Sequence, residues 1–199
     1  MVFVMNNSIL FYEKAQTVYF AVAKSANTSV REYLLKQYGE KPRYITKQDF
    51  HALPKDNLSS FSIVRNPFYR IASLWRDKIA LGDGGCTDRI LNMHSNLSFG
   101  MAFEAFCEAL CDISDNDAEG HLKSQYEILR GDDGKLLPKF VHDIDNFTLS
   151  IKLPKLNVTN HNKTDYNKYY TDKAKNAILK RYHKDFENFY KNELKGNKC

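Results

Sequence analysis

The stretch TVYFAVAKSANTSVREYLLKQY, residues 17–38, decides the fold. Its first seven residues, Thr17–Ala23, form a β-branched and aromatic run that is short enough for a buried strand. Six small or polar residues, Lys24–Ser29, come next. Apolar residues then recur at the spacing of a helix face, at Val30, Tyr33, Leu34 and Tyr38. The stretch therefore predicts a strand, a tight loop and a helix in succession.

A second strand followed by a helix is predicted in FSIVRNPFYRIASLW, residues 61–75. Phe61–Val64 has the composition of a buried strand, and Arg65 ends it. Asn66 and Pro67 then predict a helix start, because Asn is a good N-cap and Pro is favoured at the first helical position.

Further elements complete an alternation of strands and helices. They are a short strand at Pro42–Thr46, a turn or short helix at Asp49–Leu53, helices at Phe99–Cys111 and His121–Leu129, and one closing helix at Thr171–Tyr190. This alternation predicts an α/β fold with a mainly parallel central sheet. We find no repeat and no linker, so we expect a single domain over residues 1–199.

The composition is that of an ordinary globular chain. Among 199 residues, 43% are hydrophobic and 27% are charged, which excludes a largely disordered protein. No run approaches the roughly 20 apolar residues that a membrane span needs, and the N-terminus lacks the pattern of a signal peptide. We therefore expect a cytoplasmic protein without an integral membrane segment, either free or peripheral to the membrane.

Two strand ends carry residues suited to anions. Lys24–Ser29 precedes a helix, whose first N–H groups attract phosphate-like anions, and its small side chains allow close approach. At the second strand end, Arg65 offers a guanidinium fork, and Arg70 and Ser73 are expected on the polar face of the next helix. Two such sites at adjacent strand ends would suit a nucleotide with phosphates at both ends. Taken alone, each is also explained by an ordinary capped or salt-bridged helix.

Together the two motifs resemble those of sulfotransferases. VYFAVAKSANTSVREYLL (18–35) is similar to their 5′-phosphosulfate loop, and FSIVRNPFYRIASLW to their 3′-phosphate segment, of pattern V-R-[ND]-P-x-x-R-x-x-S. HLKSQYEIL (121–129) resembles a His-x-x-x-Gln segment of these proteins. LNVTNHNKT (156–164) and the residues 169–190 resemble their C-terminal Asn-rich strand and closing helix. The resemblance covers nearly the whole chain and is closest to membrane-type carbohydrate sulfotransferases and their bacterial relatives.

The resemblance implies a three-layer α/β sandwich related to P-loop nucleotide kinases. It implies 3′-phosphoadenosine 5′-phosphosulfate (PAPS) as the donor, a carbohydrate hydroxyl as the acceptor and no metal. The 5′-phosphosulfate would be cradled by Lys24, Ser25, Ala26, Asn27, Thr28 and Ser29, and the 3′-phosphate would be held by Arg65 and Ser73. Lys24 would also stabilise charge on the leaving oxygen. The loop departs from many relatives in having Asn27 where they have Cys or another small residue.

A histidine is expected to be the general base for the acceptor hydroxyl, because its pKa lies near neutrality. His51 is the first candidate, since it lies between the expected Pro42–Thr46 strand and the Arg65 strand, where related enzymes often place a His. His121 is the second. His161, in the Asn-rich segment, is expected at most to line the site. Each of these could instead be a surface or structural histidine.

Three other functions remain open at this stage. A phosphoryl transferase of similar fold is disfavoured by the lack of phosphate-loop glycines and of a strand-end Asp for Mg²⁺. The segment from Lys155 onward holds 11 basic and 5 acidic residues, which could attract an anion or a nucleic acid. Its aromatic residues fall at core spacing, so no nucleic-acid partner is expected. A non-catalytic binder of anionic glycans is the third alternative.

Overall fold

A computed structural model describes residues 8–82, 84–144 and 166–196 of the chain. The chain groups into two compact units. Unit 1 is Met1–Val64 with Gln125–Val158, and unit 2 is Arg65–Ser124 with Thr159–Cys199. Each unit is therefore assembled from two stretches of sequence, and a single domain over the whole chain stays a prediction.

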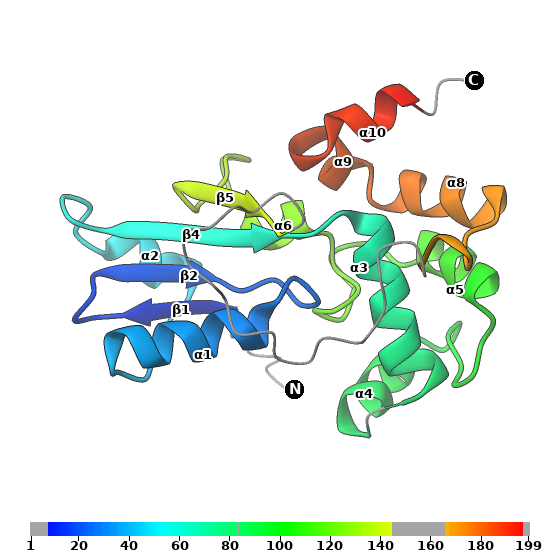
Figure 1. The fold of residues 1–199 in the computed structure, drawn as a ribbon, viewed down its shortest axis with the longest axis horizontal. Helices are drawn as coiled ribbons and strands as arrows, with labels where there is room; N and C mark the ends of the chain where they lie inside the picture. The colour runs from blue at the N-terminus through cyan, green and yellow to red at the C-terminus, as the bar shows by residue number, and fades with distance from the viewer. Residues whose placement is uncertain (1–7, 83, 145–165, 197–199) are drawn as a thin grey trace. The chain divides into compact units, whose positions relative to one another are not determined.

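Unit 1 is built on a five-stranded sheet (Figure 1). Its strands are β1 (Ile9–Tyr12), β2 (Thr17–Phe20), β3 (Arg43–Tyr44), β4 (Ser59–Val64) and β5 (Phe140–Asp143), in the order β3-β1-β2-β4-β5. β2, β4 and β5 pair in parallel, and β1 is antiparallel to both β2 and β3. Of these five strands, β1 alone runs against the rest. The predicted α/β class with a mainly parallel sheet is confirmed.

Helices flank this sheet. Helix α1 (Asn27–Tyr38) covers one face, in a buried cluster that includes Leu10, Tyr19, Val30, Leu34 and Ile63. Helix α2 (Lys47–Ala52) contacts the other face, where the rings of Phe20 and Phe50 meet edge-on with centroids 5.0 Å apart. Tyr19 and Phe20 are consecutive on β2, and consecutive strand residues point to opposite faces. The short helix α6 (Gln125–Leu129) also belongs to this unit.

The two central strands, β2 and β4, determine where the two predicted anion-binding segments begin. β2 and β4 are parallel neighbours, registered from Thr17 opposite Ser59 to Phe20 opposite Ser62. The buried hydroxyl of Ser62 also donates to the carbonyl of Phe20 at 2.8 Å, which ties the two strands beyond their backbone ladder. Their carboxyl ends consequently lie at the same edge of the sheet. The predicted loop segment Lys24–Ser29 follows the first of these ends along the chain, although its last three residues already form the first turn of α1, and Arg65 follows the second end.

The described part of unit 2 is helical. It contains α3 (Pro67–Leu74) with a π-helical continuation (Trp75–Ala80), α4 (Gly85–Met93), α5 (Phe103–Ala109) with a 3₁₀ turn (Leu110–Asp112), α8 (Asp172–Arg181), α9 (His183–Phe189) and α10 (Lys191–Gly196). The predicted start of α3 is confirmed, because the side chain of Asn66 accepts a hydrogen bond from the N–H of Phe68 at 3.0 Å and Pro67 is the first helical residue.

The prediction of one continuous closing helix is wrong. The segment breaks at Tyr182 and Tyr190, whose backbone angles leave the helical region, into α8, α9 and α10. Tyr182 is fully buried, and its hydroxyl donates to the carbonyl of Leu122 at 2.8 Å. The break lets both Tyr182 and Phe186 enter the core, so tertiary packing overrides the local helical pattern.

We predict that Ile63→Ala destabilises the protein by about 2–5 kcal/mol, because a large side chain is lost from a packed core. Ile63 lies on the central strand β4 and is 1% exposed. Leu35→Ala on α1 is the matched control, since Leu35 is 42% exposed and should change stability by less than about 0.5 kcal/mol. Urea unfolding followed by circular dichroism measures both. Equal losses in the two variants would contradict the assignment of this face as the core.

Candidate functional site

The loop after β2 turns through two non-glycine residues in the left-handed region. Lys24 has a φ of 66° and Ala26 a φ of 57°, and the N–H of Ser25 donates to the carbonyl of Val22 at 3.3 Å. Left-handed backbone costs a non-glycine residue about 1–2 kcal/mol. Ala26 is followed by right-handed Asn27, and such alternation turns successive N–H groups toward one point, which makes an anion-binding concavity.

The N-terminus of α1 differs from those of two other helices. Among the described residues, no side chain caps α1, and its first turn holds no acidic residue. By contrast, Thr46 caps α2 in a reciprocal pair with Asp49, and Thr171 caps α8. The first N–H groups of a helix have no intrahelical partner and carry a partial positive charge. The N-terminus of α1 therefore keeps both features that bind anions.

A buried hydrogen bond ties the loop after β2 to helix α6 of the same unit. The hydroxyl of Ser25 donates to Oε1 of Gln125, the first residue of α6, at 3.2 Å. Both residues are fully buried, and they lie 100 positions apart in the sequence. The resemblance had pointed to the segment containing Gln125 but had given this residue no role. The spacing Ser25–Gln125 has no local pattern, so sequence reasoning could not find this pair.

The second predicted anion segment belongs to unit 2. Arg65 lies with its guanidinium carbon 5.7 Å from the centre of the Tyr166 ring. Ser73 is buried in α3. The expectation that Arg70 lies on a polar helix face is wrong. Arg70 is 0% exposed, and its Nη2 donates to the carbonyls of His121 and Lys123, each at 2.9 Å.

The two candidate bases have different surroundings. His51 is exposed in the last turn of α2, with its ring centre 5.9 Å from that of Phe50. His121 is partly buried in unit 2, and its Nδ1 lies 3.0 Å from Oε2 of Glu119. The same carboxylate oxygen accepts a hydrogen bond from the backbone N–H of His121 at 2.6 Å. The imidazole of His121 is thus oriented by Glu119, whereas His51 lies open to solvent.

His121 is the centre of a cluster, which we call the Cys86 cluster: Cys86, Arg89, Glu119 and His121. The sulfur of Cys86 lies 3.6 Å from Nδ1 and 3.8 Å from Nε2 of His121. Arg89 forms an ion pair with the second oxygen of Glu119. A thiol, an imidazole, a carboxylate and a guanidinium therefore meet at one place, although the sequence separates Cys86 from His121 by 35 positions.

The charged groups of the Cys86 cluster shift the pKa values of one another. Burial raises the pKa of Glu119, but hydrogen bonds from His121 and the charges of His121 and Arg89 outweigh it and lower that pKa to about 2. Burial lowers the pKa of His121, yet its contacts with Cys86 and Glu119 raise it above the ordinary 6.5. Burial raises the pKa of Cys86, but the hydrogen bond and charge of His121, with the charge of Lys78, bring it below 9.0.

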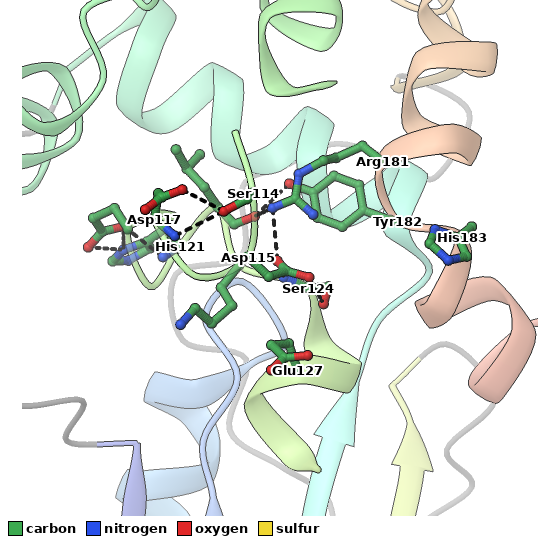
Figure 2. A network of polar contacts seen from close by, with 12 residues as sticks. Ser114, Asp115, Asp117, His121, Ser124, Glu127, Arg181, Tyr182 and His183 are labelled. Atoms are coloured by element: carbon green, nitrogen blue, oxygen red, sulfur yellow. Dashed lines mark hydrogen bonds and ion pairs between the residues drawn. The ribbon is translucent and has the colours of Figure 1, made fainter. Parts of the chain in front are cut away.

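A second polar network fixes the segment that carries His121 (Figure 2). Asp115 accepts hydrogen bonds from Arg181 at 2.8 Å and from the N–H and hydroxyl of Ser124 at 2.8 and 2.7 Å. Burial raises the pKa of Asp115, and these hydrogen bonds outweigh it and lower that pKa below its usual range. With the bond from Tyr182 to Leu122, this network anchors residues 115–124 to α8 and its C-terminal end.

The predicted site residues fall into two sets. Unit 1 holds the segment Lys24–Ser29, which spans the loop and the first turn of α1, together with His51, and it adds Gln125. Unit 2 holds Arg65, Ser73 and His121. His161 and the Asn-rich segment lie outside the described residues.

Neither a membrane span nor a metal cluster is found in the described part of the chain. None of its helices is long and apolar enough to cross a membrane. Over residues 8–82, 84–144 and 166–196, no group of three or more His, Cys, Asp or Glu side chains is arranged to hold a metal ion.

Comparison with family models identifies the family of the chain. A family model described as the sulfotransferase family matches residues 7–191, which is most of the 199-residue chain. Searches of curated proteins and of solved structures gave no significant match.

We predict that Glu119 makes the protein lose stability in acid. Its pKa of about 2 lies below the ordinary 4.5, so its contribution is present above pH 4.5 and is lost as the pH falls toward 2. Over this range the free energy of unfolding of the wild type should therefore fall more steeply than that of Glu119→Gln. The difference in slope is at most about 1.4 kcal/mol per pH unit, the limit for one proton.

Urea titrations at several pH values measure these slopes. Glu108→Gln is the matched control, because Glu108 is half exposed in a surface ion pair with Lys173 and should leave the slope nearly unchanged. The prediction fails if Glu119→Gln keeps the wild-type slope. The contribution of His121 has the opposite sign: it is complete below pH 6.5 and is lost as the pH rises through the raised pKa of the folded state.

Proposed function

Because the chain belongs to the sulfotransferase family, we propose that it transfers a sulfuryl group from PAPS to a hydroxyl of a carbohydrate. The family gives the class of reaction. The observation that best supports the donor is the N-terminus of α1. No described side chain caps it, its first turn holds no acidic residue, and it follows the left-handed residues Lys24 and Ala26. This is a backbone site for a doubly anionic group, as a phosphosulfate is.

In this proposal the two anion motifs bind opposite ends of the donor. The backbone of Lys24–Ser29 cradles the 5′-phosphosulfate, and the hydroxyls of Thr28 and Ser29 add further hydrogen-bond donors. Ser25 is buried against Gln125 and so positions the loop instead of reaching the ligand with its side chain. Arg65 and Ser73 hold the 3′-phosphate, for which a guanidinium and a hydroxyl are suited.

For the transfer, the protein must align the acceptor with the donor, take up a proton and stabilise the leaving group. An acceptor oxygen attacks sulfur in line with the bridging oxygen of the donor, and the S–O bond to that oxygen breaks. A base takes the proton of the attacking hydroxyl. The ammonium of Lys24 stabilises the negative charge that develops on the phosphate oxygen of the leaving group. The leaving group is adenosine 3′,5′-bisphosphate.

His51 is the better candidate for the base. A general base must have a free lone pair at the working pH. Burial lowers the pKa of His121, but its contacts with Cys86 and Glu119 outweigh burial and raise that pKa, which makes the ring a weaker candidate for taking a proton from an acceptor. His51 is exposed and lies in unit 1 with the loop Lys24–Ser29. The carbohydrate acceptor rests on the resemblance to carbohydrate sulfotransferases.

We predict that adenosine 3′,5′-bisphosphate raises the melting temperature of the protein. A ligand at about 100 times its dissociation constant adds about 2.7 kcal/mol. For a chain of 150–250 residues, each kcal/mol shifts the melting temperature by about 2–4 °C, so the total shift is about 5–10 °C. Lys24→Ala and Arg65→Ala should each abolish most of this shift, and each should abolish transfer.

Differential scanning fluorimetry provides the measurement, with Lys36→Ala and Arg43→Ala as matched controls. Lys36 is exposed in the last turn of α1, and Arg43 is exposed on β3, so both variants should keep the shift. A full shift in both Lys24→Ala and Arg65→Ala would contradict the site. A shift with Mg²⁺–ATP and none with the bisphosphate would instead favour a phosphoryl transferase.

We predict that His51→Ala lowers kcat by about 10²–10⁴, the usual contribution of a general base, and leaves the thermal shift by the bisphosphate intact. His121→Ala is the comparison: it should lower stability through Glu119, with a smaller effect on kcat in the protein that remains folded. Steady-state sulfation assays with donor titration separate kcat from donor binding. A selective loss of kcat in His121→Ala, with His51→Ala unaffected, would exchange the two roles.

A further inference from the structure

The Cys86 cluster is not used by the proposed reaction, yet its geometry is that of an activated thiol. We propose that Cys86 is a reactive thiolate and a site of covalent modification by hydroperoxides. This inference concerns unit 2 alone and does not rest on the proposed function.

The argument begins with the partners of the sulfur. Both ring nitrogens of His121 lie within 3.8 Å of Cys86 Sγ, and Nδ1 is engaged by Glu119 at 3.0 Å. A carboxylate beside an imidazole favours the doubly protonated ring, and the positive charge of that ring favours a thiolate close to it. The sulfur lies nearest to Nδ1, the nitrogen that Glu119 also engages, so the thiol, the imidazole and the carboxylate form one compact group.

Positively and negatively charged side chains surround the sulfur of Cys86. Lys78 and Arg89 add positive charge, with Nη2 of Arg89 at 4.0 Å from Sγ, and Glu119 opposes them. The carboxylate of Glu119 is itself paired with Arg89 and His121, which reduces its repulsion of a thiolate. Cys86 is also the second residue of α4, where the helix dipole favours an anion. These contacts outweigh the burial of Cys86 and lower its pKa, which increases the fraction of thiolate.

Two other cysteines provide an internal contrast. Cys107 is buried in α5, and burial raises the pKa of its thiol above the usual range. Cys111 is about as exposed as Cys86, but its thiol donates to the carbonyls of Ala177 at 3.4 Å and Cys107 at 3.8 Å. Burial first, and then nearby acidic groups, raise its pKa. A thiol that donates to carbonyls is held protonated, so Cys111 should be unreactive although it is accessible.

The hydroperoxide is the only oxidant that the modification of Cys86 needs. The thiolate sulfur attacks one oxygen of the hydroperoxide, the O–O bond breaks, and an S–O bond forms. Sulfur loses two electrons, and the peroxide gains them. The departing oxygen takes a proton from the imidazolium of His121 and leaves as water or an alcohol. The products are Cys86 sulfenic acid and neutral His121, which regains its proton from solvent.

Peptide-resolved alkylation of the full-length wild-type protein tests the thiolate. The native protein is treated with iodoacetamide between pH 5 and 9, digested with trypsin and analysed by mass spectrometry. Cleavage after Lys78 and Arg89 places Cys86 on a peptide separate from Cys107 and Cys111. At pH 7 Cys86 should react at least about tenfold faster than Cys111, the ratio that one pKa unit produces in thiolate fraction.

Hydrogen peroxide with dimedone then tests the modification. The expected result is a dimedone adduct on the peptide of residues 79–89 and none on the peptide that carries Cys111. An alkylation rate of Cys86 equal to or below that of Cys111, or no dimedone adduct on its peptide, would overturn the proposal.

Variants of the cluster test the cause of the reactivity. His121→Gln and Glu119→Gln should each move the alkylation midpoint of Cys86 to higher pH, and His183→Gln, on the exposed start of α9, should not. An unchanged midpoint in a folded His121→Gln protein would contradict the role of the imidazole. If His121→Gln does not fold, Glu119→Gln and the wild-type comparison with Cys111 still decide the proposal.

Discussion

The feature on which unit 1 depends is the left-handed turn after β2. Two non-glycine residues, Lys24 and Ala26, adopt a backbone that each would avoid in a free chain. The turn persists because its centre is fixed: Ser25 is buried and bonded to Gln125, and β2 is held in register by β4. The strain is thus balanced by a hydrogen bond in a dry environment, where such a bond is strongest. Its result is a start of α1 that, among the described residues, has no side-chain cap.

In unit 2, two buried guanidinium groups fix the conformation of the segment that carries His121. Arg70 binds the carbonyls of His121 and Lys123, and Arg181 binds Asp115 at the beginning of the same segment. A buried arginine is costly without hydrogen-bond acceptors, so the acceptors that these cations find on residues 115–124 favour one conformation of that segment. The position of His121 relative to Glu119 and Cys86 follows from that selection.

The sequence predicts the parts of this structure that depend on local rules. The strand, loop and helix over residues 17–38 and the cap of α3 at Asn66 were predicted because β-propensity, helical spacing and capping act over a few residues. Strand β1 was not predicted, since it is four residues long and is joined to β2 by a turn without Gly or Pro. The break at Tyr182 depends on its bond to Leu122, 60 positions away, which no local pattern records.

The candidate site divides in the same way. Lys24–Ser29 and Arg65 could be singled out because each follows a strand within a few residues. Gln125 and the Cys86 cluster could not, because only the fold brings their residues together with their partners.

The two histidines show why residue type alone does not assign a role. Both His51 and His121 lie in segments that the family resemblance singles out, and both have the ordinary imidazole chemistry. Their surroundings separate them: Glu119 and Cys86 give His121 two reasons to hold its proton, whereas His51 is solvent-exposed at a helix end. An imidazole that is already a partner in an ion pair stabilises a thiolate well and accepts a substrate proton poorly, because accepting that proton requires it first to lose its own. The carboxylate of Glu119 therefore does more than orient a ring. Because its contacts raise the pKa of His121, they favour interaction with the neighbouring sulfur over proton abstraction, and His51 stays the base that we propose.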